Sequence, residues 1–500
     1  MRNYVALTIG PVFETISGAS TPGALWCASG LFSRLAGDLC ASVTLDIPDA
    51  QIIAPAYDPA VTYNDGVGRW HDRIFFSSDL TAEGLKEKLQ TICTNTKDKI
   101  ANHIHAAILF RGDALTRVQN YIRDYIQIHW LIAPEAVAHA NGHNCILNLS
   151  GYLDSMELTS GFVPDDTSNP LTALFSGTEQ SSNTYIKNCW LIPKGEIGSS
   201  FQLLNEGNIR EINDIANPTA AQDGLRIRGY YAVVYSDGDN MGKALGRIPD
   251  DEAVRQFQNC CVEYAGEAAS AIGDFGGLTI YAGGDDLLFL APVLGKNDEN
   301  ILELCTRITQ IFDRMFASYH VDGSHSPSLS FGISVNYIKY PLYEALEDAR
   351  ELLFNDAKSE QKNQLALAVH KRSGQSIKMI LPNRIDEDSP ISELSNFIRQ
   401  QRCDAEKVLH SVLHTLNVYK SSFALCKQHE MDTQNLYDNL FDCYAHDVKR
   451  SYIQSIKSLG DSMERDGGCR SDGANGMCSD SVEVLIAMLW FAKLYTEKGV

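Results

Sequence analysis

The sequence Gly-Gly-Asp-Asp at residues 283–286 constrains this chain more than any other feature, because it separates two short apolar runs. Residues 278–282 and 287–291 have the length and composition of buried strands, and a glycine pair between such strands predicts a tight turn. Asp285 and Asp286 would raise each other's pKa there, unless a cation such as Mg²⁺ lies between them. A solvated hairpin turn fits the four letters equally well, because turns favour glycine and aspartate.

The region around these four residues, 229–385, alternates strands and helices. Helices are expected at 251–272, which has acidic residues in its first turn, and at 300–317, where apolar residues recur on one face. Strands are expected at 229–235, 278–282, 287–291 and 329–337, followed by a helix at 343–359 and a strand at 365–369. The order strand, helix, strand, strand, helix, strand is that of the ferredoxin-like split βαβ fold.

A second acidic motif follows the first strand of this region, in the segment Ser-Asp-Gly-Asp-Asn-Met-Gly-Lys at residues 236–243. In a split βαβ sheet the first strand lies beside the hairpin, so Asp237 is expected to face Asp285 and Asp286. Three carboxylates can hold two Mg²⁺ ions, which activate an attacking hydroxyl and stabilise the leaving oxygen of a phosphoryl displacement. The segment alone also fits a solvated loop, but the two motifs together favour a nucleotide site.

The loop that follows Asp237 suits a triphosphate. Gly238 and Gly242 leave its backbone open for a close approach. Lys243 is expected to contact phosphate oxygens, although a solvated surface position would explain this lysine equally well.

The first part of the chain, residues 1–141, repeats the same order more loosely and predicts a second palm-like domain. Strands are expected at 4–9, 52–53, 73–76 and 127–132, and helices at 22–39 and 80–108. Gly10 and Pro11 end its first strand where the other region has Asp237, so this domain is expected to be degenerate. Residues 142–228 predict an interposed small domain, and residues 386–500 a helical domain, with helices at 390–403, 405–416, 431–459 and 479–497.

The composition limits which cellular compartment and which binding partners are expected for this protein. A net charge of −21 disfavours a protein that grips nucleic acid alone, so any RNA contact is expected to be local or shared with basic partner subunits. No apolar run is long enough to span a bilayer, and no signal peptide is recognisable, which favours the cytoplasm and no membrane contact. Thirteen cysteines without paired spacing predict reduced thiols and disfavour a zinc site without excluding one.

The two acidic motifs also carry a resemblance to a known family. Residues 231–243 and 281–286 resemble the second palm domain of the CRISPR polymerase family, the large subunits of type III CRISPR effector complexes. Residues 7–12, 25–29 and 72–76 are similar to the first palm of the Cmr-type, or III-B, branch. The resemblance covers nearly the whole chain. Its palm motifs are specific, whereas the C-terminal region matches only in its helical character.

The resemblance implies an α+β fold with two ferredoxin-like palm domains of the nucleotidyl cyclase and polymerase type, an interposed small domain and a C-terminal helical domain that docks onto a small subunit. It implies a nucleotidyltransferase activated by target RNA. A ribose 3′-hydroxyl attacks the α-phosphate of ATP, pyrophosphate leaves, and a cyclic oligoadenylate second messenger forms. Other subunits of a type III-B complex, with guide RNA and target RNA held through the complex, are the implied partners.

The resemblance also assigns residues by motif. The implied ligands of Mg²⁺ or Mn²⁺ are Asp237, Asp285 and Asp286. The implied contacts to the nucleotide are Gly238, Asn240, Lys243, Gly283, Gly284 and Lys358. For the amide and the two lysines of this set, a solvated surface position is the alternative.

The chain departs from the family pattern in several ways. It starts directly at the first palm, without the HD nuclease domain that many relatives carry. His71-Asp72 and His446-Asp447 lack a second histidine cluster, so both pairs are expected to be structural and DNase activity is not expected. The usual cysteine cluster of the interposed module is absent. Without these modules the acceptor could be a small molecule other than ATP, which the same site would join to AMP.

Two other classes of function compete with this reading. A non-catalytic scaffold that only binds nucleotide or holds subunits together has no need of three clustered carboxylates. A stand-alone diguanylate or adenylate cyclase is disfavoured by the duplicated palm and the helical C-terminal region. Leu287 also stands where diguanylate cyclases have a phenylalanine after the second acid.

Overall fold

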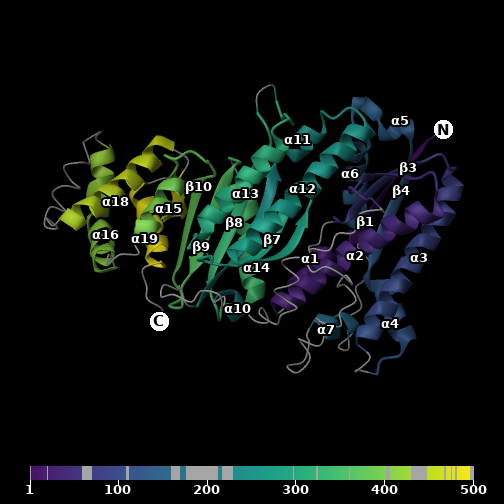
Figure 1. Cartoon of the computed structure of the whole chain (residues 1–500), viewed down its shortest axis with the longest axis horizontal. Coiled ribbons are helices and arrows are strands. Elements are labelled where there is room, and N and C mark those ends of the chain that lie inside the picture. Colours follow the sequence, from purple (N-terminus) through teal and green to yellow (C-terminus); the bar gives the residue numbers. More distant parts are fainter. Residues whose placement is uncertain are drawn as a thin grey trace.

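The computed structural model describes residues 2–19, 21–58, 70–108, 112–158, 169–175, 212–216, 229–296, 298–322, 325–359, 361–400, 406–428, 447–466, 469–473, 476–478 and 481–495. Within these residues the chain is an α+β protein with two β-sheets, and helices cover the sheets (Figure 1). No helix in this part of the chain is long and apolar enough to cross a bilayer.

The first sheet has four strands in the order β2-β3-β1-β4, all antiparallel. Its strands and main helices are β1 (Asn3–Gly10), α2 (Pro22–Asp46), β2 (Gln51–Ala54), β3 (Arg73–Ser78), α3 (Ala82–Ala107) and β4 (Gln127–Pro134). Every strand predicted for this region is present. The short helices α1 (Val12–Ser17) and α4 (Leu115–Tyr125) were not predicted.

The second sheet contains a copy of the same arrangement. Its elements in chain order are β5 (Tyr230–Asp239), α12 (Asp251–Phe275), β6 (Leu278–Gly283), β7 (Asp286–Pro292), α13 (Ile301–Phe316) and β8 (Ser328–Tyr337). The strand order β8-β5-β7-β6 matches β4-β1-β3-β2 of the first sheet, so both regions have the predicted ferredoxin-like order.

Four more strands extend the second sheet beyond β8. They are β9 (Gln364–His370), β10 (Ser376–Pro382), β11 (Arg470–Gly473) and β12 (Gly476–Cys478). Strand β9 pairs with β8 in parallel, and the other three follow as antiparallel neighbours. Only β9 was predicted. Strands β11 and β12 lie between the helices predicted at 431–459 and 479–497, where no strand was expected, because a pairing partner about 90 residues earlier leaves no local signal.

Helices from both regions cover the second sheet. Helices α12 and α13 pack on one face, where Tyr264, Phe312 and Phe316 make edge-on ring contacts. The other face contacts α14 (Leu342–Glu351) and also α2 of the first region, through Leu25 and Trp26. Figure 1 shows α2 and α1 reaching from the first region under the second sheet. A shared apolar cluster therefore holds the two regions together.

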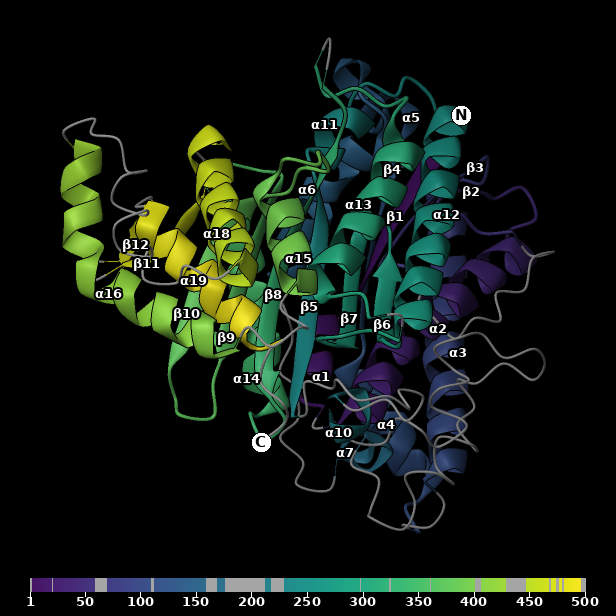
Figure 2. The same ribbon diagram turned by 60° about the vertical axis from the view of Figure 1, so that its left-hand side comes forward.

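The remaining described helices lie around these sheets. They are α5 (Glu135–Ala138), η2 (Ala140–Gly142), α6 (Cys145–Glu157), α7 (Pro170–Phe175), α10 (Ile212–Ala216), α11 (Met241–Leu245), α15 (Pro390–Gln400), α16 (Glu406–Gln428), α18 (Asp447–Asp466) and α19 (Ser481–Lys493). The C-terminal helices gather beside the β9–β12 end of the second sheet (Figure 2). The helices predicted at 390–403, 405–416 and 479–497 are present, whereas part of the one predicted at 431–459 lies outside the described residues.

Candidate metal and nucleotide site

The acidic motifs meet because β5 extends past its neighbour β7. Pairing of β5 with β7 ends at Ser236, opposite Leu287, whereas pairing with β8 continues to Asp239, opposite Ser328. The hairpin turn between β6 and β7 therefore lies beside the last residues of β5. Gly284 has φ +69°, a left-handed conformation that glycine adopts without strain, so it allows this tight turn.

The three predicted metal ligands form one cluster. A carboxylate oxygen from each of Asp237, Asp285 and Asp286 lies within 4.8 Å of the others, and the described residues contain no other such group of three acidic, histidine or cysteine side chains. Burial, and then the charge of Asp237, raises the pKa of Asp285 to about 7. The pKa of Asp286 is raised for the same reasons, although its side chain still reaches solvent in the cleft. A bound divalent cation would relieve this repulsion.

Lys358 already supplies a positive charge to the cluster. Its Nζ forms an ion pair with Asp237, donates to the carbonyl oxygen of Gly238 at 3.0 Å, and lies 3.5 Å from Oδ1 of Asp239. The side chain is only 12% exposed, so the ammonium group acts as an internal cation among the carboxylates. Because this ammonium group already lies among the carboxylate oxygens, the same oxygens are suited to binding a metal cation. The predicted contact of Lys358 with phosphate stays a prediction.

A π-helix positions this lysine. Helix α14 continues as the π-helix η3 (Leu352–Ala357), and the backbone N–H of Lys358 donates to the carbonyl oxygen of Leu353 at 3.0 Å. Such wider turns are rare and frequently lie at functional sites. The sequence predicted one regular helix over 343–359, because a π-turn has no recognisable spacing of apolar residues.

Asp239 is a member of the site to which the sequence assigned no role. Its side chain is completely buried, and Oδ2 accepts hydrogen bonds from Ser330 Oγ at 2.7 Å, Ser328 Oγ at 3.2 Å and the backbone N–H of Asn363 at 2.7 Å. These bonds join the end of β5 to β8 and to the residue before β9. The Asp239 carboxylate therefore holds in place the end of β5, the strand that contains Asp237 and Gly238.

All nine residues named from the sequence line one cavity of about 720 Å³, which is within the size range of pockets for small ligands. Asn240 lies at the turn into α11, where its backbone has the left-handed φ of +62°. Nζ of Lys362 lies 3.5 Å from the Oδ1 atom of Asn240. Gly238 allows the closest approach, because a Cβ there would lie 2.5 Å from Oδ2 of Asp285. The structure thus brings the predicted residues together, while their roles toward a nucleotide remain a proposal.

The first region also contributes residues to the wall of this cavity, which the sequence did not predict. His71, Asp72 and Arg73 line it together with the residues of the hairpin turn. Nε2 of His71 lies 3.3 Å from Oε1 of Gln258, burial lowers the pKa of His71, and burial raises the pKa of Asp72. The pair was expected to be structural, and no feature of its local sequence indicates that it faces a cavity. His446 lies outside the described residues.

We expect the substitution Lys358→Met to lower stability most strongly in Mg²⁺-free buffer. Removing the ammonium group leaves the carboxylates uncompensated, at a cost of about 2 kcal/mol for a partly buried pair. Added Mg²⁺ should then raise the Tm of the variant more than that of the wild type, as measured by thermal unfolding with and without the ion.

Lys99→Met is the matched control, since Lys99 pairs with Asp38 in the first region, away from the carboxylate cluster. It should lose some stability without gaining any extra response to Mg²⁺. An equal Mg²⁺ shift in the wild type and in Lys358→Met would contradict the compensating role of the lysine.

We expect Gly238→Ala to displace the carboxylate of Asp285. The new Cβ would lie 2.5 Å from Oδ2 of Asp285 and 2.6 Å from Cγ of Met241, so the Asp285 carboxylate must shift. A misplacement near 1 Å can cost on the order of a hundredfold in rate. Gly151→Ala on α6 is the control, because nothing lies within 4 Å of its added Cβ and Gly151 does not line the cavity. Equal ATP turnover in the two variants would refute the close approach at Gly238.

Comparison with known proteins first defines the class of the site. Residues 230–366 match the family model described as Cas10/Cmr2, second palm domain, which is the region that holds the carboxylate cluster. The chain is 34% identical over 227 residues to the CRISPR system Cmr subunit Cmr2 of Pyrococcus furiosus. That match covers 39% of this chain and only 24% of the relative.

Solved structures agree with this class at the level of the fold. A type III-B Cmr-beta complex in the apo state matches with a TM-score of 0.54 at 10% identity, over 98% of this chain and 82% of that chain. A Csm1–Csm4 cassette in complex with cA4 matches with a TM-score of 0.54 at 10% identity, over 99% of this chain and 70% of that chain. Residues 230–366 are thus similar to the second palm domain of the Cas10/Cmr2 family, as the acidic motifs predicted.

Proposed function

We propose that this chain is an Mg²⁺-dependent nucleotidyltransferase that transfers AMP from ATP to an acceptor hydroxyl. This proposal rests on one observation: the carboxylates of Asp237, Asp285 and Asp286 lie close together at the ends of neighbouring strands. Three mutually repelling carboxylates are costly to keep together unless they serve a cation. The two divalent ions that such a set can hold supply an activated hydroxyl and a stabilised leaving group.

The residues of the chain fit the steps of this transfer. The acceptor oxygen forms a bond to the α-phosphorus, the bond from that phosphorus to the β-phosphate oxygen breaks, and pyrophosphate takes the electron pair. Gly238, Gly283 and Gly284 allow the backbone to approach the triphosphate. Lys243 and Lys358, which line the same cavity, would offset its negative charge, and in this role Lys358 would exchange its carboxylate partner for phosphate.

We propose a cyclic oligoadenylate as the product, made when the 3′-hydroxyl of one adenylate attacks the next ATP. The match of residues 230–366 to the Cas10/Cmr2 second palm domain supports this, as does the likeness of the fold to a Csm1–Csm4 cassette in complex with cA4. We further propose that the chain works as a subunit of a type III-B complex and meets guide RNA and target RNA there. Its net charge of −21 supports such sharing with basic subunits.

A different acceptor is the alternative product chemistry. The part of the cavity wall from the first region presents Asp72 beside Arg73, a mixed pair that does not by itself select a triphosphate. AMP joined to another small molecule would leave the metal site and the leaving group unchanged. A non-catalytic nucleotide-binding scaffold is the remaining alternative, and it predicts binding of ATP without release of pyrophosphate.

The test uses the reconstituted complex with target RNA, Mg²⁺ and labelled ATP. We expect pyrophosphate release that requires target RNA, with adenylate oligomers resolved by chromatography. Adding small-molecule extracts to the same reaction separates an oligoadenylate from an adenylate conjugate by the mass of the product. Binding of ATP with no release of pyrophosphate under any of these conditions would exclude the transferase.

A further inference from the structure

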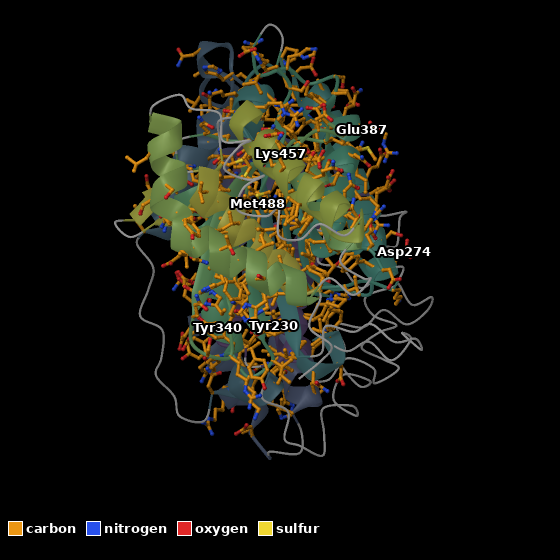
Figure 3. All side chains as sticks on the ribbon, turned by 90° about the vertical axis from the view of Figure 1, so that its left-hand side faces the viewer. Tyr230, Asp274, Tyr340, Glu387, Lys457 and Met488 are labelled. Atoms are coloured by element: carbon orange, nitrogen blue, oxygen red, sulfur yellow. The ribbon has the colours of Figure 1, made fainter. Side chains whose placement is uncertain are left out.

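A second cavity, of about 430 Å³, lies at the end of the second sheet that is remote from the carboxylates. Tyr337 at the end of β8 lines it and pairs with Tyr230, the first residue of β5, whereas Asp237 lies near the other end of β5. At about 3.3 Å per residue, the two sites are roughly 20–25 Å apart. Figure 3 shows Tyr340 and Tyr230 at this end, below Met488 of α19.

Three cations line this cavity in a chain that is strongly acidic overall. They are Lys339, Lys371 and Arg372, contributed by the turn after β8 and by the hairpin between β9 and β10. Lys339 and Arg372 are exposed, and no carboxylate among the described residues forms an ion pair with either of them. With a net charge of −21 for the whole chain, such a local concentration of positive charge points to an anionic ligand.

Aromatic rings alternate with these cations. The Arg372 guanidinium lies 5.7 Å from the centre of the Tyr337 ring, and Nζ of Lys371 lies 3.3 Å from the centre of the Trp490 ring. The rings of Tyr340 and His370 stack at 4.8 Å with an interplanar angle of 19°. Of these rings, those of Tyr337, Tyr340 and His370 line the cavity, so the cavity offers aromatic surface as well as charge, which a site for inorganic phosphate does not need.

A carboxylate fixes the stacked pair in position. Asp348 Oδ2 accepts a hydrogen bond from Tyr340 Oη at 2.8 Å and lies 3.2 Å from Nε2 of His370. The hydrogen bond holds the Tyr340 ring, and the His370 ring stacks on it, so this aromatic pair is ordered before any ligand arrives, which reduces the entropy lost on binding. Preformed aromatic faces beside lysine and arginine are the features by which proteins hold single strands, with bases on the rings and phosphates on the cations.

We propose that this cavity binds a segment of single-stranded nucleic acid. Lys339, Lys371 and Arg372 would contact successive phosphates, and a base would stack at the Tyr337–Tyr340 side of the cavity. A volume of 430 Å³ suits an unpaired nucleotide and excludes a duplex from the cavity itself. The site is separate from the carboxylate cavity and does not depend on nucleotidyl transfer.

The test measures binding of a fluorescein-labelled 12-nucleotide oligouridylate RNA to the full chain by fluorescence anisotropy, at low salt. EDTA is present so that divalent ions do not recruit the strand to the carboxylates. We expect Lys371→Gln/Arg372→Gln to raise the Kd about tenfold or more, and to reduce the slope of log K against log salt by about 1.4 for two lost phosphate contacts. Tyr340→Leu should also raise the Kd.

Lys86→Gln/Lys88→Gln, which removes the same charge from the exposed face of α3, is the matched control and should change the Kd less than twofold. The proposal is overturned if the wild type does not bind the RNA, or if both double variants weaken binding equally. It is also overturned if AMP competes as well as the 12-nucleotide strand, since this would make the cavity a mononucleotide site. Unchanged Tm values exclude unfolding as the cause of any loss.

Discussion

Asp285→Asn/Asp286→Asn should reduce the release of pyrophosphate from ATP by about a thousandfold or more in the reconstituted complex with target RNA. Both substitutions keep the size of the side chain and remove the negative charge that would hold the ions. Loss of metal-derived stabilisation of the transition state is worth several kcal/mol, and about 4 kcal/mol corresponds to three factors of ten in rate. Steady-state pyrophosphate release measures the effect.

The double variant should fold and assemble normally, because it removes charges whose pKa values are already raised by burial and mutual repulsion. Its Tm without Mg²⁺ should equal or exceed that of the wild type. Asp274→Asn, an exposed aspartate on α12 labelled in Figure 3, is the control and should keep full activity. Turnover equal to the wild type in the double variant would remove the catalytic assignment.

Gly332→Ala should have the largest effect on stability. A Cβ at this position of β8 would lie 2.2 Å from the carbonyl oxygen of Ala349 and 2.5 Å from the backbone N of Leu353. Backbone atoms cannot rotate away, so the helix formed by α14 and η3 must separate from the sheet. Overpacking of this kind costs about 3 kcal/mol, at the upper end of the usual range. Thermal or denaturant unfolding measures the loss.

The same variant links stability to the site, since η3 leads directly into Lys358. We therefore expect turnover to fall as well at temperatures where the variant is still folded. Gly151→Ala on α6 is the control, because nothing lies within 4 Å of its added Cβ, and it should leave stability unchanged or slightly raised. A Tm for Gly332→Ala within a degree of the wild type would show that α14 and η3 are not held tightly against β8.

The parts of the fold that were predictable are those encoded in neighbouring residues. Buried strands such as β5 and β7 are continuous apolar runs, and α13 has a single apolar face, so their types and order could be assigned. Strand β11 pairs with β10 although its four residues, Arg470–Gly473, have the composition of a turn. Its conformation is decided by a distant edge and not by its own sequence.

The candidate site likewise has parts that the local sequence predicted and parts that only the tertiary structure reveals. Asp237, Asp285 and Asp286 could be named because two short motifs lie at ends of strands that a split βαβ sheet makes adjacent. The pairing of Lys358 with Asp237 and the hydrogen bonds of Asp239 required the π-turn and the exact extension of β5 past β7. The part of the cavity wall from the first region depends on how the two regions pack against each other. No pattern of neighbouring residues in the sequence predicts that packing.

The pairing of β10 with β11 ties the C-terminal region to the sheet through main-chain hydrogen bonds. Arg470 also donates from its guanidinium to Oε1 of Gln364, at the start of β9, at 2.9 Å. A single proteolytic cut between α15 and α18 would therefore leave two fragments that remain associated. Loss of the later fragment would uncover the edge of β10, and an uncovered edge is a template for pairing with another chain.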